Sequence, residues 1–341
     1  MNFPAQPVDE AAAWRPSDLA SDTSWVHRLN GDELTELDAA ARLVSSRGLA
    51  AGEFERDDFP VPDLSGRIDR ILHELEHGRG CVLIRGLDVT RYDMPTLKIL
   101  YWGLGVHLGL PVTQNARGDL IGQVTDSGSE YQSKNVRGYT TNDAIRFHCD
   151  AADGVSLLCV HHAKSGGDSV IASSLTIFNE ILQHSPQYLD ALAEGFYFDL
   201  RGEGATGDPD EVTRHKVPVF SYYDGRLSAR YNRKTIEDGQ AKAGDPLSSG
   251  RLEAVRLVED LANREDIRFN MTFERGDIQL LNNHMILHAR EAFEDFPEPE
   301  RKRNLLRLWF NFRNARKLDP IFAERLNTGP RGGVAVKNQD Y

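Results

Sequence analysis

Phe147-His148-Cys149-Asp150 leads directly into an apolar segment, Gly154 to Val160 (GVSLLCV). The apolar segment predicts a buried strand, and the run before it places a histidine and an aspartate two positions apart. Residues i and i+2 of an extended chain point to the same face, so this His-x-Asp pair can reach one metal ion. A chain with eleven histidines also produces such pairs by chance. A solvated loop pair is therefore the alternative interpretation, and other segments must decide between the two.

Composition limits the classes of function. The chain has 341 residues, of which 40% are hydrophobic and 27% charged, as is ordinary for a globular protein. Its net charge of −12 argues against a nucleic-acid partner or an anionic membrane surface, because both require a basic face. A local basic cluster can still hold a small anion. The three cysteines form no Cys-x-x-Cys pair, which disfavours a zinc knuckle or a disulfide framework.

The beginning of the chain lacks the basic and apolar regions of a secretory signal, and no apolar run approaches the roughly 18 residues that span a bilayer. We therefore expect a cytoplasmic protein whose partner is a small-molecule substrate. Neither nucleic acid nor a membrane is expected as a partner, and self-association into a homo-oligomer stays open.

The spacing of apolar residues predicts helices in the first third of the chain and short strands from about residue 118. Two helices interrupt the strands, one from Ser174 past Pro186 to Leu192 and one from Arg251 to Asn263. The stretches 202–210 and 237–250 are rich in Gly, Asp and Pro and predict surface insertions. Strands are also expected at 195–200 and 217–222.

No alternation of strands and helices typical of a parallel doubly wound sheet is present, and no Gly-x-Gly-x-x-Gly or Walker loop. The pattern predicts an α+β protein with a mainly β core, a closed antiparallel architecture such as a jelly roll with flanking and inserted helices. We expect residues 1–62 to form an N-terminal extension packed on the body, and residues 63–341 to form a single domain.

A second polar segment, Gly276 to Arg290 (GDIQLLNNHMILHAR), contains a turn, an apolar strand and two histidines. His288 follows the strand where the chain leaves or re-enters the sheet, and it could add a third ligand to the His-x-Asp pair. His284, four residues earlier, is its competitor. Two imidazoles and one carboxylate leave three metal positions open, which is the arrangement of non-haem Fe(II) oxygenases. A 2-oxo acid fills two of these positions and O₂ the third.

Arg303 and Arg307 lie four residues apart in an apolar strand, so both point the same way. Cations that face a core need an anion, and a carboxylate ligand would meet a guanidinium well. The alternative is an edge strand with both arginines on its solvent-exposed face. Ser169, after the Gly166-Gly167 turn, could add a hydroxyl donor.

These motifs, in this order, resemble the taurine dioxygenase / clavaminate synthase-like family of Fe(II)- and 2-oxoglutarate-dependent oxygenases. The resemblance covers about residues 81–312 and implies a double-stranded β-helix, the cupin-like jelly roll. It implies that His148, Asp150 and His288 bind the iron. It also implies that Arg303, assisted by Ser169, binds the distal carboxylate of 2-oxoglutarate, and that Arg307 meets an anionic group of the substrate. The division of work between the two arginines stays open.

The resemblance implies oxidation of a C–H bond, most simply hydroxylation, in a small polar substrate with an anionic group. The reaction would consume O₂ and convert 2-oxoglutarate to succinate and CO₂. Asp150 disfavours halogenation, for which related enzymes replace the metal carboxylate. The alternatives are a metal-binding jelly-roll sensor or scaffold without catalysis, and a metal-dependent hydrolase or isomerase. Residues 125–141 form either a lid or a plain loop, and the candidate substrate contacts are Gln123, Tyr131, Asn142 and Asn232.

Overall fold

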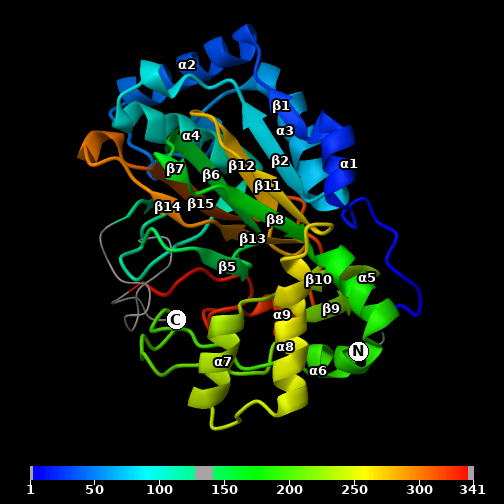
Figure 1. Ribbon diagram of the computed structural model, residues 1–341. Helices are drawn as coiled ribbons and strands as arrows, with labels where there is room; N and C mark the ends of the chain where they lie inside the picture. The colour runs from blue at the N-terminus through cyan, green and yellow to red at the C-terminus, as the bar shows by residue number, and fades with distance from the viewer. Residues whose placement is uncertain (1–2, 127–140, 337–341) are drawn as a thin grey trace.

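The computed structural model describes residues 3–126 and 141–336, and most of its strands form two sheets (Figure 1). The larger sheet has the order β1-β2-β12-β6-β15-β3, with β4 also paired to β15, and every pair except β1 with β2 is antiparallel. Its strands are β1 Val26–Arg28, β2 Cys81–Arg85, β3 Gly109–Pro111, β4 Ile121–Val124, β6 Gly154–His161, β12 Ile278–Asn282 and β15 Asn304–Phe312.

The smaller sheet is antiparallel and has the order β11-β8-β13-β5. Its strands are β5 Ile145–His148, β8 Ser169–Ser173, β11 Arg268–Met271 and β13 Ile286–Arg290. Two strand pairs stand apart from both sheets. They are β7 Ser165–Gly166 with β14 Phe293–Glu294, and β9 Phe220–Tyr223 with β10 Arg226–Ala229.

Helices lie on both sides of the paired sheets. Figure 1 shows α2, α3 and α4 on the outer side of the larger sheet, and α6, α7 and α8 at the other end of the molecule. The helices are α1 Pro16–Ser21, α2 Gly31–Ser46, α3 Pro62–His77, α4 Met94–Leu108, α5 Ser174–His184, α6 Leu189–Glu194, α7 Arg233–Lys242, α8 Ser249–Ala262 and α9 Pro320–Ala323. Within the described ranges, none of them combines the length and the apolar character needed to cross a bilayer.

Alternation along β15 divides the core in two. Leu306, Leu308 and Phe310 pack with α2, α3 and α4, whereas Leu305 and Trp309 belong to the core that includes the smaller sheet. Successive side chains of a strand point to opposite faces, so residue 307 lies on the same face as Leu305 and Trp309. The face of β15 that carries residue 307 is therefore the one directed at the smaller sheet.

The edge-strand interpretation of the two arginines is wrong. β15 pairs with β6 along one side and with β3 and β4 along the other. Arg303, immediately before β15, is 4% exposed, and Arg307 is 7% exposed. Two buried guanidinium groups in this position require negative charge nearby.

Three local expectations differ from the structure. Residues 237–250 do not form an insertion throughout, because α7 occupies Arg233–Lys242 and Asn232 caps it through the backbone N–H of Thr235. The helix expected over 174–192 is broken by a 3₁₀ turn that begins at Pro186, which has no N–H to continue the helix. The strands expected at 195–200 and 217–222 are reduced to isolated bridges and to β9.

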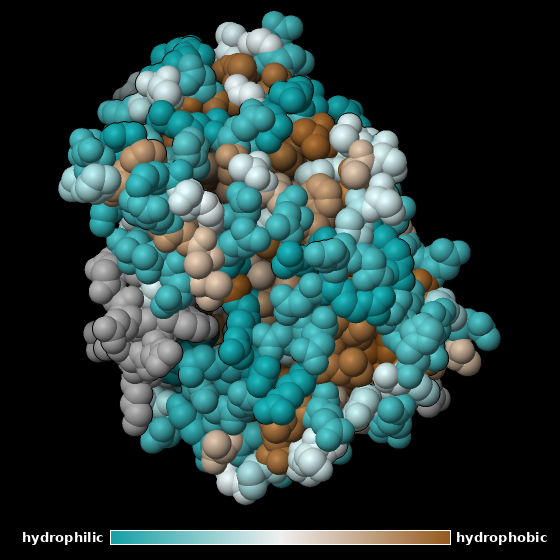
Figure 2. Space-filling view, in the orientation of Figure 1, coloured by the Kyte–Doolittle hydropathy of each residue, from teal (hydrophilic) through white to brown (hydrophobic). Residues whose placement is uncertain are grey.

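The face in Figure 2 is mostly hydrophilic, and its apolar side chains gather in several separate patches. The N-terminal segment contributes buried residues to the core. Trp14 is 3% exposed, its indole N–H donates to the carbonyl of Arg79, and its own carbonyl accepts from Thr176 Oγ1. Residues before α2 therefore pack against the turn after α3 and against α5.

Gly276 permits a close approach that positions β12. Its φ is +87°, and a Cβ there would lie 1.7 Å from the carbonyl oxygen of Leu87. We expect Gly276→Ala to lower the free energy of unfolding by about 2–4 kcal/mol, because it combines positive φ with a backbone clash. The matched control is Gly225→Ala in the β9–β10 hairpin, where φ is +78° and the space is open. Equal losses for both variants in urea titrations would contradict the steric part of this explanation.

Candidate active site

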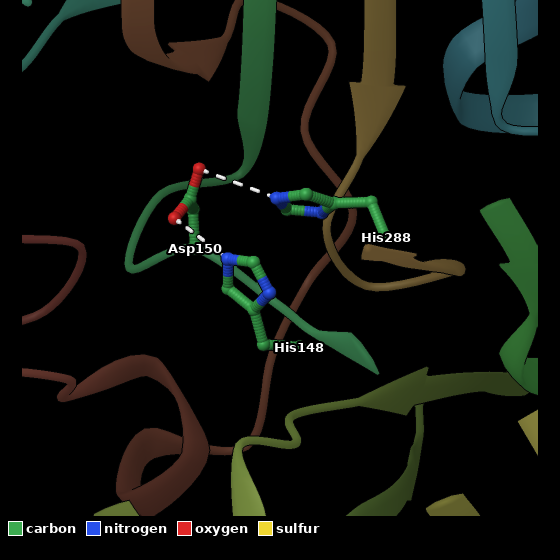
Figure 3. Close-up of side chains that lie close together, drawn as sticks. All are labelled: His148, Asp150 and His288. Atoms are coloured by element: carbon green, nitrogen blue, oxygen red, sulfur yellow. Dashed lines mark ion pairs between the residues drawn. The ribbon is translucent and has the colours of Figure 1, made fainter. Parts of the chain in front are cut away.

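Three side chains from β5, β13 and the loop after β5 point toward one another (Figure 3). His288 in β13 lies directly opposite His148 in the antiparallel pairing with β5, and the ring centroids are 4.3 Å apart. The carboxylate of Asp150 is 3.8 Å from His148 Nε2 through Oδ1 and 3.6 Å from His288 Nε2 through Oδ2. One ligand atom from each of the three residues lies within 4.8 Å of the others.

The imidazole of His148 is prepared as a neutral ligand. Its Nδ1 lies 2.9 Å from the carbonyl oxygen of Arg146, which fixes the tautomer with the proton on Nδ1 and leaves the lone pair of Nε2 directed at Asp150. Burial, together with the nearby His288, lowers the pKa of His148 to about 4. The ring is therefore uncharged at neutral pH, as metal ligation requires.

The carboxylate of Asp150 is prepared as an anion. Trp309 Nε1 donates to Oδ2 at 2.8 Å, and Arg307 Nη1 lies 4.0 Å from Oδ1. Burial opposes ionisation of this carboxyl, but the charge of Arg307 and the neighbouring His288 outweigh burial and hold the pKa of Asp150 well below its ordinary value. The backbone N–H of Asp150 donates to Asn283 Oδ1 at 3.0 Å, which holds the loop in place.

His284 lies in a different cluster. Its Nε2 is 2.9 Å from Oδ1 of Asp153, and Arg325 Nη2 reaches the same oxygen at 2.5 Å. Burial lowers the pKa of His284 to about 4. The structure thus brings His288, and not His284, to the pair formed by His148 and Asp150.

The three-residue group opens into a cavity of about 810 Å³ that Ser169, Arg303 and Arg307 also line. Arg303 Nη1 is buried and has no hydrogen-bond partner among the described residues, while Nη2 lies 3.4 Å from the carbonyl oxygen of Gly167. Ser169 Oγ is hydrogen-bonded to the side chain of Gln279. Arg307 Nε donates to Gln114 Oε1 at 2.7 Å.

The residues fit divalent iron and a dicarboxylate. Two imidazole nitrogens and one carboxylate oxygen converge from neighbouring segments, a donor set that suits Fe(II) and leaves positions for other ligands. His288 Nδ1 is buried without a partner in the described part of the chain. Burial lowers the pKa of Arg303 to about 10, as expected for a guanidinium that lacks a neutralising anion.

The candidate substrate contacts are only partly in the cavity. Asn232 lines the cavity and forms an isolated antiparallel β-bridge with His148. Gln123 donates to Asn304 Oδ1 and lies outside the lining, as does the exposed Asn142. Tyr131 and most of the segment 125–141 lie outside the described residues, so the choice between a lid and a plain loop stays open.

Sequence reasoning missed several residues of the site. Trp309 could have been found from alternation along β15, since it lies two residues after Arg307 on the same face. Arg230 lies two residues before Asn232, and both line the cavity. Gln114 and Asn283 had no comparable signal, because they reach Arg307 and Asp150 only through the tertiary fold.

Comparison with known proteins identifies the family. The family model described as taurine catabolism dioxygenase TauD, TfdA family matches residues 45–309. The chain belongs to this family. It is a non-haem iron dioxygenase that uses 2-oxoglutarate and O₂, and the expectation drawn from its motifs is confirmed.

The family members most similar in sequence include two proteins matched over most of their length. FR-33289 synthase of Streptomyces rubellomurinus is 31% identical over 92% of this chain and 92% of its own. Taurine hydroxylase-like protein SAT17 of Stachybotrys chartarum is 27% identical over 88% of this chain and 79% of its own.

Solved structures share the fold. Asparagine oxygenase in complex with Fe(II), (2S,3S)-3-hydroxyasparagine and succinate is 14% identical, with a TM-score of 0.64 over 84% of this chain and 94% of that one. The non-haem iron oxygenase OrfP in complex with Fe and α-ketoglutaric acid is 15% identical, with a TM-score of 0.59 over 83% and 92%. The mixed arrangement of helices and sheets is therefore that of non-haem iron oxygenases.

Proposed function

We propose that this dioxygenase hydroxylates a C–H bond of a small polar substrate that carries an anionic group, with His148, Asp150 and His288 as the iron ligands. The observation that carries the proposal is the convergence of these three side chains in a cavity lined by basic residues. Bound iron, together with 2-oxoglutarate and O₂, supplies the oxidant for the C–H bond.

The protein's own residues orient the ligands. The carbonyl of Arg146 holds the ring of His148, and the indole of Trp309 holds one oxygen of Asp150. Groups that orient metal ligands in this way fix both geometry and basicity. Arg307 lies close to Asp150 and lines the cavity, so it can contact a ligand that binds next to the metal.

Arg303 is the proposed partner of the distal carboxylate of 2-oxoglutarate. It is the more isolated of the two arginines, since Nη1 has no partner among the described residues, whereas Arg307 contacts Gln114 and Asp150. The hydroxyl of Ser169 lines the same cavity and can donate to the same carboxylate. A guanidinium and a hydroxyl together match the acceptor oxygens of a carboxylate.

The fold proposal accompanies the site. We infer that the two facing sheets are the halves of a double-stranded β-helix within a domain of residues 63–341. The antiparallel order β2-β12-β6-β15 in one sheet and β11-β8-β13-β5 in the other supports this assignment.

Charge supports an anionic substrate. Among the described residues that line the cavity, nine are Arg or Lys and five are Asp or Glu, although the whole chain carries a net charge of −12. A pocket of opposite sign to the protein concentrates anions and repels cations. The solved neighbours bind hydroxylated asparagine or arginine, which supports a substrate of similar size.

Binding of 2-oxoglutarate to Arg303 gives a direct test. In an anaerobic titration of the Fe(II)-loaded chain, wild type is expected to develop a weak visible charge-transfer band as 2-oxoglutarate is added. Arg303→Met should raise the half-saturating concentration about 100-fold, because a buried charge-assisted pair is lost. Arg301→Met is the control, since Arg301 is exposed and lies two residues away. No band in wild type would contradict the function, and an unchanged titration in Arg303→Met would contradict the assignment of Arg303.

Turnover separates the function from its alternatives. A panel of small anionic molecules is to be screened for O₂-dependent release of succinate. A sensor or scaffold would release none, and a hydrolase or isomerase would convert a substrate without consuming O₂.

A further inference from the structure

One of the nine basic residues that line the cavity, Arg230, comes from a different segment than Arg303. Arg230 follows β10, whereas Arg303 precedes β15 of the larger sheet, and both line the cavity that contains the three proposed ligands. The backbone around Arg230 runs antiparallel to the ligand segment. Asn232 is bridged to His148, and the N–H of Cys149 donates to the carbonyl of Tyr231 at 2.8 Å. Continued by one residue, this register places Arg230 opposite Asp150.

The guanidinium of Arg230 is held in place without being neutralised. Nη2 donates to the carbonyl of Arg325 at 2.7 Å, Nη1 is 3.4 Å from the carbonyl of Glu324, and the group lies over the ring of Phe198 at 4.5 Å from its centroid. No carboxylate lies within 4.0 Å of it in the described part of the chain. Carbonyl oxygens and a ring face orient a cation, but they leave its full charge to be met by an anion.

Most other basic residues of the cavity are already paired. Those with a carboxylate within 4.0 Å are Arg146 with Glu259, Arg201 with Glu203, Arg233 with Glu237 and Glu259, Lys234 with Asp238, Lys242 with Asp199 and Asp210, and Arg307 with Asp150. Arg303 lacks such a pair, and 2-oxoglutarate is its proposed anion. Arg290, which also lines the cavity, donates to the backbone carbonyls of Thr141 and Asp143. Arg230 has no carboxylate within 4.0 Å among the described residues and no proposed ligand.

We propose that Arg230 binds the anionic group of the primary substrate, a carboxylate, sulfonate or phosphonate, on the side of the cavity formed by the segment after β10. This inference rests on the proposed function and adds a residue to Arg307, whose charge is shared with Asp150. With its anionic group bound by Arg230, a short substrate lies next to the segment that carries His148 and Asp150. Burial and the neighbouring Arg325 lower the pKa of Arg230 to about 9, because both disfavour its positive charge.

The test measures binding without turnover. Calorimetric titrations are made anaerobically on the chain loaded with Fe(II) and saturated with 2-oxoglutarate, so that Arg303 is occupied. The probes are butyrate, propane-1-sulfonate and propylphosphonate, with 1-propanol as the neutral reference. Wild type is expected to bind at least one anion about tenfold or more tightly than 1-propanol, because a desolvated guanidinium strongly favours an oxyanion.

Arg230→Gln should lose that preference, and Arg230→Lys should keep part of it, since lysine retains the charge but not the two-point geometry. The control is Arg214→Gln. Arg214 also approaches Glu324, but it pairs with the carboxylate at 3.1 Å and does not line the cavity. This control should bind the anions as wild type does.

Affinity for 2-oxoglutarate and the melting temperature separate substrate binding from a structural role. Both should be unchanged in Arg230→Gln if Arg230 serves the substrate alone. Wild-type anion binding by Arg230→Gln, or an equal loss of 2-oxoglutarate binding, would overturn the inference, as would a wild type that prefers no anion. Failure of wild type to bind 2-oxoglutarate would contradict the proposed function instead, and the anion titrations of wild type and Arg230→Gln would still decide the role of Arg230.

Discussion

His148→Ala is expected to abolish iron binding and substrate-dependent succinate formation. Groups that merely orient a ligand are worth about 10–100-fold in metal affinity or activity, so loss of a ligand should exceed about 1000-fold. The variant keeps only two ligand side chains, those of Asp150 and His288. Two ligands hold the metal less tightly than the three of wild type. Iron content after gel filtration and the rate of succinate release measure the two effects.

His215→Ala provides the control, because His215 is exposed and lies outside the cavity. The metal-free His148→Ala protein should melt close to metal-free wild type, since its ring contacts chiefly the other two ligand side chains and Arg146 O. Normal turnover by His148→Ala would refute the assignment of His148 as a ligand.

Asp153→Asn is expected to lower the free energy of unfolding by about 3–5 kcal/mol, the cost of removing one partner from a buried ion pair. The Asp153 carboxylate is 0% exposed and receives Arg325 Nη2 at 2.5 Å, Arg331 Nε at 3.0 Å and His284 Nε2 at 2.9 Å. Without its charge, two guanidinium groups stay close together and uncompensated. Urea denaturation monitored by circular dichroism measures the loss.

The loss depends on pH. Burial opposes ionisation of Asp153, but the charge of Arg325 and the hydrogen bond from His284 hold its pKa well below the ordinary 3.8. The folded state therefore binds this proton less readily than the unfolded state. The stabilisation is present in full above the unfolded pKa and declines as pH falls below it, so wild type and Asp153→Asn should converge in acid.

Asp266→Asn is the matched control for Asp153→Asn. Asp266 also contacts two arginines, Arg15 and Arg264, but its side chain is 52% exposed. Exposed ion pairs contribute about 0–1 kcal/mol. Similar losses in the two variants would show that burial does not amplify the interactions of Asp153.

Local sequence patterns were sufficient to predict the family and many residues of the site. His148 and Asp150 are two residues apart at the end of β5, and Arg303, just before β15, is four residues from Arg307 within it, so period-two geometry predicts their common faces. The choice between His284 and His288 was not readable from spacing. It depends on which residue of the β12–β13 segment comes to lie opposite His148, and that pairing joins positions 140 residues apart.

The rest depends on tertiary contacts. Arg230 lines the cavity because the segment after β10 pairs with the segment that carries His148 and Asp150. No local sequence pattern predicts that pairing. α7 was missed because the Gly, Asp and Pro residues of 237–250, most of which follow the helix, outweighed the capping signal of Asn232 and Thr235. The boundary at residue 62 stays a prediction, as do cytoplasmic location and the oligomeric state.

The cluster around Asp153 also has a consequence for biosynthesis. Asp153 and Arg325 are 172 residues apart, so at about 5–20 residues per second the ribosome adds Arg325 about 9–35 s after Asp153. Throughout that interval the nascent chain carries an aspartate whose buried position has no arginine to balance it. We therefore expect closure around Asp153 to be unfavourable until Arg325 has been synthesised.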